Sequence, residues 1–148
     1  MSQQQLLEQF AIQQVAYRYA NAVDRRDASA LAQCFADEYT GIGPGYVMRG
    51  KGAEIAAQIA TVIGQMYIWT MHNVHNTDYV IDGDTATGTT NCVASHVSVK
   101  DGNHVKLDWY IKYTDKLVKQ NGQWRFSERS LHTRYTTTET VQPLDPAV

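Results

Sequence analysis

The stretch LLEQFAIQQVAYRYANAVD, residues 6–24, decides the fold of this chain. Its apolar residues recur every three to four positions, a spacing typical of a helix with one buried face. These residues are Ile12, Ala16, Tyr19, Ala20 and Val23. Asp24 follows one turn after Ala20 and therefore lies close to the buried face. A carboxylate there is costly unless it is paired or hydrogen-bonded, so its partner is the first question the sequence raises. The ordinary alternative is a helix-end carboxylate that Arg25, Arg26 or solvent satisfies.

The bulk composition is that of one ordinary globular domain. The chain has 148 residues, of which 43% are hydrophobic, enough for a sizeable core. Its net charge of −2 and the lack of a basic run argue against a nucleic-acid partner. It shows neither a signal-peptide pattern nor the roughly 20 consecutive apolar residues of a membrane span. The two cysteines, Cys34 and Cys92, make no disulfide framework. Together these features predict a reduced, cytoplasmic protein that does not associate with membranes.

Two shorter helices are predicted after the first. Asp27 and Ser29 are both plausible N-caps for a second helix over residues 28–35. A third helix is expected over residues 53–66, where isoleucines and valines form an apolar stripe. Gly64 lies near the end of this helix, where glycine suits a C-cap.

The rest of the chain is predicted to form strands. An extended segment turns at Pro44-Gly45 and returns over residues 46–49. Asp82-Gly83 and Asn121-Gly122 are strong hairpin signals between longer strands. These four strands are expected over residues 68–81, 85–99, 104–118 and 123–138. Three helices and a long sheet make an α+β layer architecture. If the sheet curls around the first helix, it makes a cone whose open end is a pocket, with Asp24 facing into it.

Strand histidines are the candidate partners of Asp24. Side chains alternate between the two faces of a strand, so His72 and His75 point apart, which argues against a metal-binding pair. His96 shares a face with small residues, a pattern that indicates either a closely packed helix or a pocket into which His96 looks. The small residues are Ala86, Gly88, Thr90, Cys92, Ala94 and Ser98. An aspartate can fix the tautomer of a histidine and stabilise its protonated ring, which prepares the histidine to take a proton from a substrate.

Four segments along the chain form a series that resembles a known family. They are residues 12–35 with Val23-Asp24-Arg25-Arg26-Asp27, residues 70–76 (TMHNVHN), the hairpin DGDTA at residues 82–86, and residues 113–129 with Asn121-Gly122-Gln123-Trp124. In this order they resemble the SnoaL-like proteins of the nuclear-transport-factor-2-like superfamily. The resemblance implies a single SnoaL-like domain over residues 1–148. It also implies a cystatin-like α+β cone, in which a curved mixed or antiparallel sheet wraps around the long N-terminal helix, usually in a homodimer or homotrimer.

The resemblance also assigns catalytic roles. The chain is similar to scytalone dehydratase, bile-acid 7α-dehydratase and lindane dehydrochlorinase, which are lyases that use an Asp–His dyad and no cofactor. Asp24 matches their aspartate and His72 matches their histidine. Tyr19 and His96 match further catalytic positions. No metal is implied.

Three other residues are candidates for substrate binding. They are Tyr39, Trp109 and Arg129. Arg134 is an alternative to Arg129 as the C-terminal arginine of the bile-acid enzyme, because the register of the last strand is open.

Three functions follow from these assignments. The first is a dehydratase-type lyase acting on a small hydrophobic substrate that is a hydroxylated aromatic, polycyclic or steroid-like molecule. In it His72 removes a proton, Asp24 orients His72, and Tyr19 or His96 polarises or protonates the leaving oxygen. The second is an isomerase or polyketide-cyclase-like enzyme with the same dyad. The third is a small-molecule binding module without chemistry, in which Asp24 and His72 form a buried structural pair. Both enzyme hypotheses require the two side chains in contact beside a cavity of roughly 300 Å³ or more.

Overall fold

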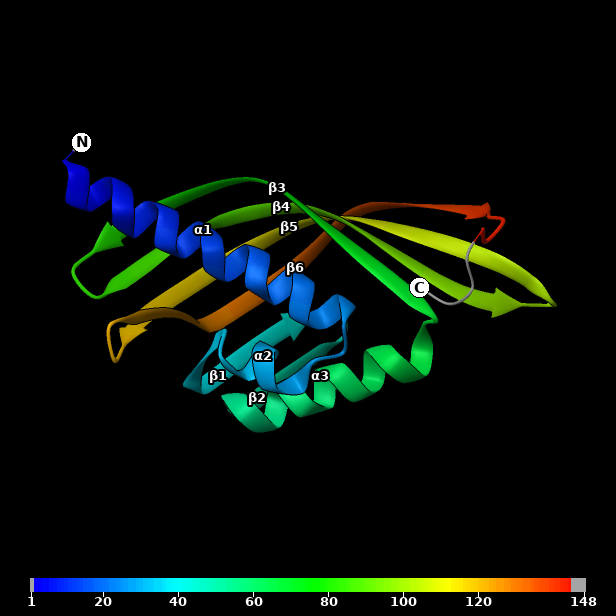
Figure 1. Ribbon diagram of the computed structural model, residues 1–148, viewed down its shortest axis with the longest axis horizontal. Helices are drawn as coiled ribbons and strands as arrows, with labels where there is room; N and C mark the ends of the chain where they lie inside the picture. The colour runs from blue at the N-terminus through cyan, green and yellow to red at the C-terminus, as the bar shows by residue number, and fades with distance from the viewer. Residues whose placement is uncertain (1, 145–148) are drawn as a thin grey trace.

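The computed structural model describes residues 2–144 as three helices and a six-stranded sheet (Figure 1). The helices are α1 (Gln3–Asp24), α2 (Ala28–Ala32) and α3 (Gly52–Met66). The strands are β1 (Phe35–Gly43), β2 (Tyr46–Lys51), β3 (Trp69–Asp82), β4 (Thr85–Lys100), β5 (Asn103–Gln120) and β6 (Gln123–Thr140). None of the helices in this part of the chain is long and apolar enough to cross a membrane.

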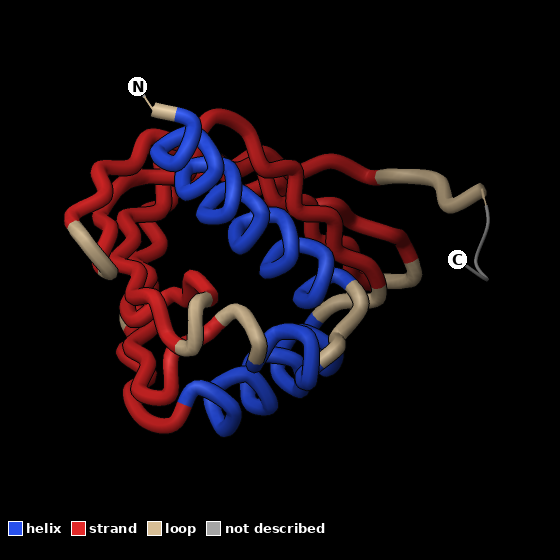
Figure 2. Tube along the Cα trace, turned by 60° about the vertical axis from the view of Figure 1, so that its left-hand side comes forward, coloured by secondary structure: helices blue, strands red, loops and turns tan. Residues whose placement is uncertain are grey.

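The sheet is mixed, curved and open. Its strand order is β2-β1-β6-β5-β4-β3, and every pair is antiparallel except β1 with β6, which is parallel. Figure 2 shows the strands bending around α1, with α2 and α3 below it. Register shifts interrupt the β1–β6, β3–β4 and β5–β6 pairs, and such bulges increase local twist and bend. The fold is the α+β cone that the sequence predicts.

The first helix has the predicted buried face and sharp ends. Ser2 caps it and forms a capping box with Gln5. Its buried residues include the predicted apolar set, and all of them except Ala20 pack in the main core together with Phe35 and Phe126. Arg26 has a left-handed backbone with φ of 55°, which stops the helix just after Asp24.

The second helix is shorter than predicted. Asp27 caps it by accepting a hydrogen bond from the backbone N–H of Ala30 at 2.9 Å, so Ser29 is not the cap. The helix stops at Ala32, and Phe35 already belongs to β1, opposite Phe126 of β6. The predicted continuation to residue 35 is wrong because a pairing with a distant strand takes over these residues.

The third helix lies where it is predicted, but Gly64 does not end it. The backbone N–H of Tyr67 donates to the carbonyl of Ile63 at 3.0 Å, so the helical hydrogen bonds continue past Gly64. Tyr67, which has an extended backbone, is the C-cap. The connection from Tyr67 into β3 brings α3 close to the end of α1, where Asp24 lies.

Candidate active site

Asp24 and His72 are in direct contact. Asp24 is the last residue of α1, and His72 lies on the inner face of β3, opposite the buried Ala94 of β4. The Nδ1 atom of His72 lies 2.7 Å from Asp24 Oδ1, and the backbone N–H of His72 donates to Asp24 Oδ2 at 2.8 Å. The hydroxyl of Thr70 donates to Asp24 Oδ1 at 2.9 Å. Three donors from one strand therefore hold the carboxylate.

The neighbouring arginines do not satisfy this carboxylate. Arg25 pairs with Asp27 at 3.8 Å. Arg26 donates to backbone carbonyls, including that of Asp24. The strand β3, rather than a helix-end arginine, is the partner of the Asp24 side chain.

The protonation states of the dyad follow from these contacts. Burial by itself would raise the pKa of Asp24, but hydrogen bonds from the ring and backbone of His72 and from Thr70 outweigh it, so the pKa is lowered. An ionised carboxylate only accepts hydrogen bonds, so Nδ1 of His72 carries a hydrogen. The Nε2 atom of His72 is then free to act as a base.

His72 lines a cavity of about 460 Å³ enclosed by α1, α3 and the inner face of the sheet. This volume is within the usual range of ligand sites, about 300–1,000 Å³. Six of the seven predicted site residues line it, and Asp24 lies behind His72. The lining residues are Tyr19, Val23, Tyr39, Gly41, Ile42, Tyr46, Met48, Ile59, Val62, Ile63, Met66, Tyr67, His72, His96, Trp109, Ile111, Tyr113, Arg129 and Leu131.

His96 lies beside His72 in the cavity wall. The two ring centroids are 5.7 Å apart with the ring planes at 78°. The rings of Tyr67 and Trp109 flank His96 at centroid distances of 4.6 and 5.4 Å. Burial, followed by the proximity of His72, lowers the pKa of His96 to about 4. His96 is therefore neutral at neutral pH.

Five tyrosines line the cavity, and three of them, Tyr19, Tyr39 and Tyr113, are buried. Burial raises the pKa of Tyr19 to about 12 and raises the pKa of Tyr39 and of Tyr113 well above the ordinary value. Each phenol therefore keeps its proton at neutral pH and can donate a hydrogen bond.

Arg129, not Arg134, is the arginine that lines the cavity. Its Nε donates to Asp115 Oδ1 at 2.8 Å and its Nη2 donates to Asp115 Oδ2 at 3.1 Å. The guanidinium carbon lies 3.9 Å from the ring centroid of Tyr113 and 4.5 Å from that of Tyr19. Burial would lower the pKa of Arg129, but the Asp115 carboxylate raises it above the ordinary value, so the charge is permanent. Arg134 is exposed at the register shift of β6.

Sequence reasoning missed the network that holds Arg129. Asp115 Oδ2 accepts hydrogen bonds from the hydroxyl of Tyr79 at 2.8 Å and from that of Thr90 at 2.9 Å. The sequence does contain a signal for this network. Asp115 lies two residues from both Tyr113 and Leu117, so strand alternation places it on the same face of β5, which their apolar side chains predict to be buried. Thr70 was missed for a similar reason: it lies two residues before His72 and therefore on the same face.

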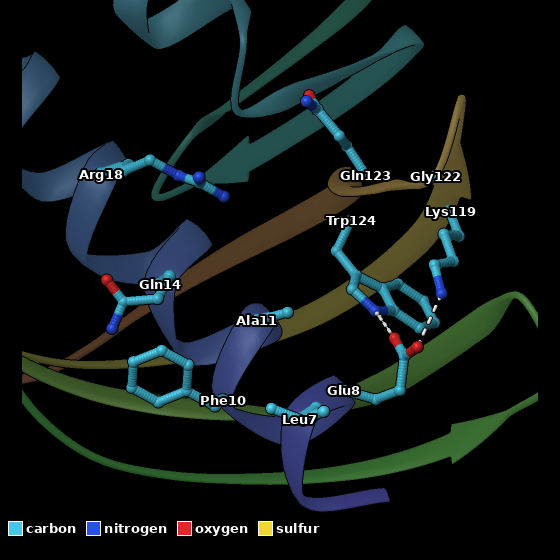
Figure 3. Close-up of a pocket in the computed structure, with 10 residues that line it drawn as sticks. All are labelled: Leu7, Glu8, Phe10, Ala11, Gln14, Arg18, Lys119, Gly122, Gln123 and Trp124. Carbon is cyan, nitrogen blue, oxygen red and sulfur yellow. Dashed lines mark hydrogen bonds and ion pairs between the residues drawn. The ribbon is translucent and has the colours of Figure 1, made fainter. Parts of the chain in front are cut away.

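A second hollow lies away from this site. It is an open groove of about 440 Å³ between the first half of α1 and the β5–β6 turn (Figure 3). Its one carboxylate, Glu8, accepts hydrogen bonds from Lys119 at 2.7 Å and from the Trp124 indole at 2.6 Å, and the bond from Lys119 is the main cause of its lowered pKa. No predicted site residue lines this groove, and Glu8 is already neutralised by Lys119.

The described part of the chain holds no preformed cluster of metal-ligating side chains. Within residues 2–144 no group of three or more His, Cys, Asp or Glu side chains is arranged to hold a metal ion. His75 is exposed, whereas His72 faces the cavity. The arrangement of the cavity instead suits proton transfer: a base backed by a carboxylate, with neutral phenols and a fixed cation nearby.

Comparison with known proteins gives the chain its family. The family model of the SnoaL-like domain matches residues 4–130. A candidate scytalone dehydratase from Novosphingobium aromaticivorans is 25% identical over 99% of this chain and 97% of its own, with a TM-score of 0.82. A type 2 hexachlorocyclohexane dehydrochlorinase (LinA) is 22% identical over 97% of both chains, with a TM-score of 0.82, a likeness of fold. The Mycobacterium tuberculosis protein Rv3472, of unknown function, is 27% identical over 98% of this chain and 79% of its own, with a TM-score of 0.76. No curated protein matches the chain in sequence. Because the family model covers most of a chain that folds as an α+β cone, this protein belongs to the SnoaL-like family of the nuclear-transport-factor-2-like superfamily.

Proposed function

We propose that this protein is a cofactor-independent lyase of the dehydratase type. The observation that carries the proposal is the contact of His72 with the ionised Asp24 at the wall of a cavity of about 460 Å³. A buried histidine that only stabilised the fold would not need to open onto empty space. The 25% identity to a candidate scytalone dehydratase supports the same reaction class.

The proposed reaction is an elimination of water. His72 Nε2 takes a proton from a carbon next to an electron-withdrawing group, and Asp24 stabilises the imidazolium that forms. The electron pair of the broken C–H bond forms a carbon–carbon double bond as the C–O bond breaks. The leaving oxygen takes a proton and departs as water.

Donors for the leaving oxygen and for charge on the substrate are available in the same cavity. The neutral hydroxyl of Tyr19, about one turn before Asp24, is the proposed proton donor, and the imidazolium of His72 restores its proton. Arg129 uses two of its five N–H groups in the pair with Asp115, so it can also donate a hydrogen bond to a substrate oxygen on which negative charge develops. Tyr39 and Trp109 bind the substrate through their rings.

The cavity lining indicates the kind of substrate. It is mostly aliphatic and aromatic, and the charge of Arg129 is already paired with Asp115. An ionic substrate would lose its hydration without gaining an unpaired counter-charge, which is costly. The proposed substrate is therefore a neutral, hydrophobic and hydroxylated molecule of aromatic, polycyclic or steroid-like type.

The test is a screen of hydroxylated ketones and fused-ring alcohols, with products read by mass spectrometry. A lyase yields a product that has lost water, whereas an isomerase or cyclase with the same dyad yields one of unchanged mass. Replacing Asp24 by Asn or His72 by Gln, with the fold verified by circular dichroism, should lower kcat by about 10²–10⁴-fold. His75→Gln, on an exposed part of the same strand, is the matched control and should leave kcat unchanged. Ligand binding without turnover, unaltered in both dyad variants, would instead indicate a binding module.

A further inference from the structure

His96 presents an unprotonated nitrogen to the cavity. Its Nδ1 lies 3.3 Å from the backbone carbonyl of Leu107. A carbonyl oxygen only accepts hydrogen bonds, so Nδ1 must carry the hydrogen of the neutral ring. Burial, with a contribution from His72, keeps the pKa of His96 near 4, so at neutral pH no second proton is present. The Nε2 atom of His96 is therefore an acceptor with nothing to donate.

This nitrogen is open to a ligand. His96 lines the cavity although the residue as a whole is buried. Within residues 2–144 no hydrogen bond reaches Nε2, and this atom is not among the buried polar atoms that lack a partner. Nε2 therefore faces the cavity, where a donor on a bound molecule can reach it.

Two acceptor nitrogens lie on neighbouring strands of the cavity wall, and the indole N–H of Trp109, whose ring flanks His96, is a buried donor without a partner among the described residues. His72 and His96, on the neighbouring strands β3 and β4, both keep their hydrogen on Nδ1 and offer Nε2. Tyr19, Tyr113 and Arg129 form a separate cluster, held by ring and guanidinium contacts, and all three can donate. A substrate satisfies the two histidines by bringing hydrogens to their Nε2 atoms, and it satisfies Tyr19, Tyr113 and Arg129 by bringing oxygen lone pairs to them.

We infer that His96 determines specificity by accepting a hydrogen bond from a hydroxyl group that the substrate keeps, close to the carbon that His72 deprotonates. The ligand class is a neutral phenol, enol or alcohol. A ketone, ether or carboxylate at this place would set oxygen lone pairs against Nε2 and leave a buried acceptor unpaired. The leaving oxygen belongs at the donor cluster, because His96 has no proton to give it. The position of this hydroxyl relative to the reacting carbon rests on the proposed function, whereas the preference of His96 for a hydroxyl does not.

The binding test uses a matched pair of ligands, 2-naphthol and 2-methoxynaphthalene, which differ in whether the oxygen carries a hydrogen. Isothermal titration gives the ratio of their dissociation constants for the wild type and for His96→Phe. The variant removes the acceptor, so the preference for naphthol should fall by about 5- to 100-fold, mainly through weaker naphthol binding. His96→Gln, which retains an acceptor oxygen, should recover part of the preference, and His75→Gln should leave it unchanged. Dividing the wild-type ratio of dissociation constants by that of the variant cancels the difference in solubility between the two ligands. An unchanged ratio in a folded His96→Phe variant would overturn the inference.

A measurement on the unmodified protein guards against a variant that does not fold. Nitrogen-15 NMR of the histidine rings should show His96 with a hydrogen on Nδ1 and none on Nε2, and the Nε2 signal should shift with 2-naphthol but not with its methyl ether. A hydrogen on Nε2 would overturn the inference. If the hydroxyl preference is found but no substrate loses water, the proposed function fails and the role of His96 stands. If water is lost without that preference, the role of His96 fails and the lyase stands.

Discussion

At the scale of single residues, Thr70 is the least obvious contributor to the dyad. Its hydroxyl donates to the Asp24 carboxylate at 2.9 Å. Thr70→Val keeps the shape of the side chain but removes this donor, so the free energy of unfolding should fall by about 1–2 kcal/mol at pH 7. Thr70→Ser keeps the hydroxyl and should cost much less. Urea denaturation followed by circular dichroism measures both, and a Val variant as stable as the Ser variant would show that the hydroxyl does not hold the carboxylate.

Single residues also show how much of the candidate site can be predicted from the sequence. Helical spacing places Asp24 beside the buried face, but it cannot tell which strand passes the end of the helix. The pairing with His72 came from family resemblance. The choice between Arg129 and Arg134 required the structure, because the register shift in β6 leaves Arg134 as an extra residue between the partners of Tyr110 and Ile111. Strand alternation read from the sequence cannot detect such a shift.

At the scale of elements, β4 approaches β3 so closely at Gly88 that only glycine fits. A Cβ atom there would lie 2.1 Å from the carbonyl oxygen of Asp78 and 2.4 Å from the ring of Tyr79. Gly88→Ala must therefore push β3 away and disturb the bond of Tyr79 to Asp115, at an expected cost of about 2–4 kcal/mol in the free energy of unfolding.

Gly64 is the control for Gly88. It lies inside α3, where an added Cβ would be 3.6 Å from the nearest atom, an ordinary contact. Gly64→Ala should raise the free energy of unfolding by about 0.5–1 kcal/mol, because alanine favours a helix over glycine. Chemical denaturation of the two variants should therefore give opposite signs. If both substitutions destabilised the protein, the space around the added Cβ atom would not determine either result.

Elements built from local signals were predictable and those built from distant contacts were not. Asn121-Gly122 makes the predicted hairpin turn, with φ of 51° and 75° at its two residues, as a type I′ turn requires. The end of α2 was predicted wrongly, because the carbonyl of Cys34 accepts a hydrogen bond from the N–H of Phe126 at 2.8 Å. No spacing within residues 28–35 reveals a partner more than ninety positions away.

At the scale of the whole molecule, the cone places one helix and one sheet around the same cavity. The helix α1 supplies Asp24 and Tyr19, while the sheet supplies His72, His96 and Arg129. His96 is buried in this arrangement without an acidic partner of its own among residues 2–144. Such burial ties the stability of the entire fold to pH, because the unfolded chain can protonate a histidine that the folded chain keeps neutral.

The pH dependence follows with a definite sign. The ordinary pKa of histidine is about 6.5 and that of His96 in the fold is about 4, so protons bind the unfolded state first as the pH falls. The stability linked to His96 is complete above pH 6.5 and is lost progressively toward pH 4. Between pH 7.5 and pH 5 the loss should be about 2 kcal/mol. Urea denaturation at both pH values should show a smaller loss by that amount in His96→Gln, since Asp24 and His72 are common to both proteins. Equal losses in the two proteins would mean that His96 binds a proton as readily in the fold as in the unfolded chain, which its burial and the nearby His72 oppose.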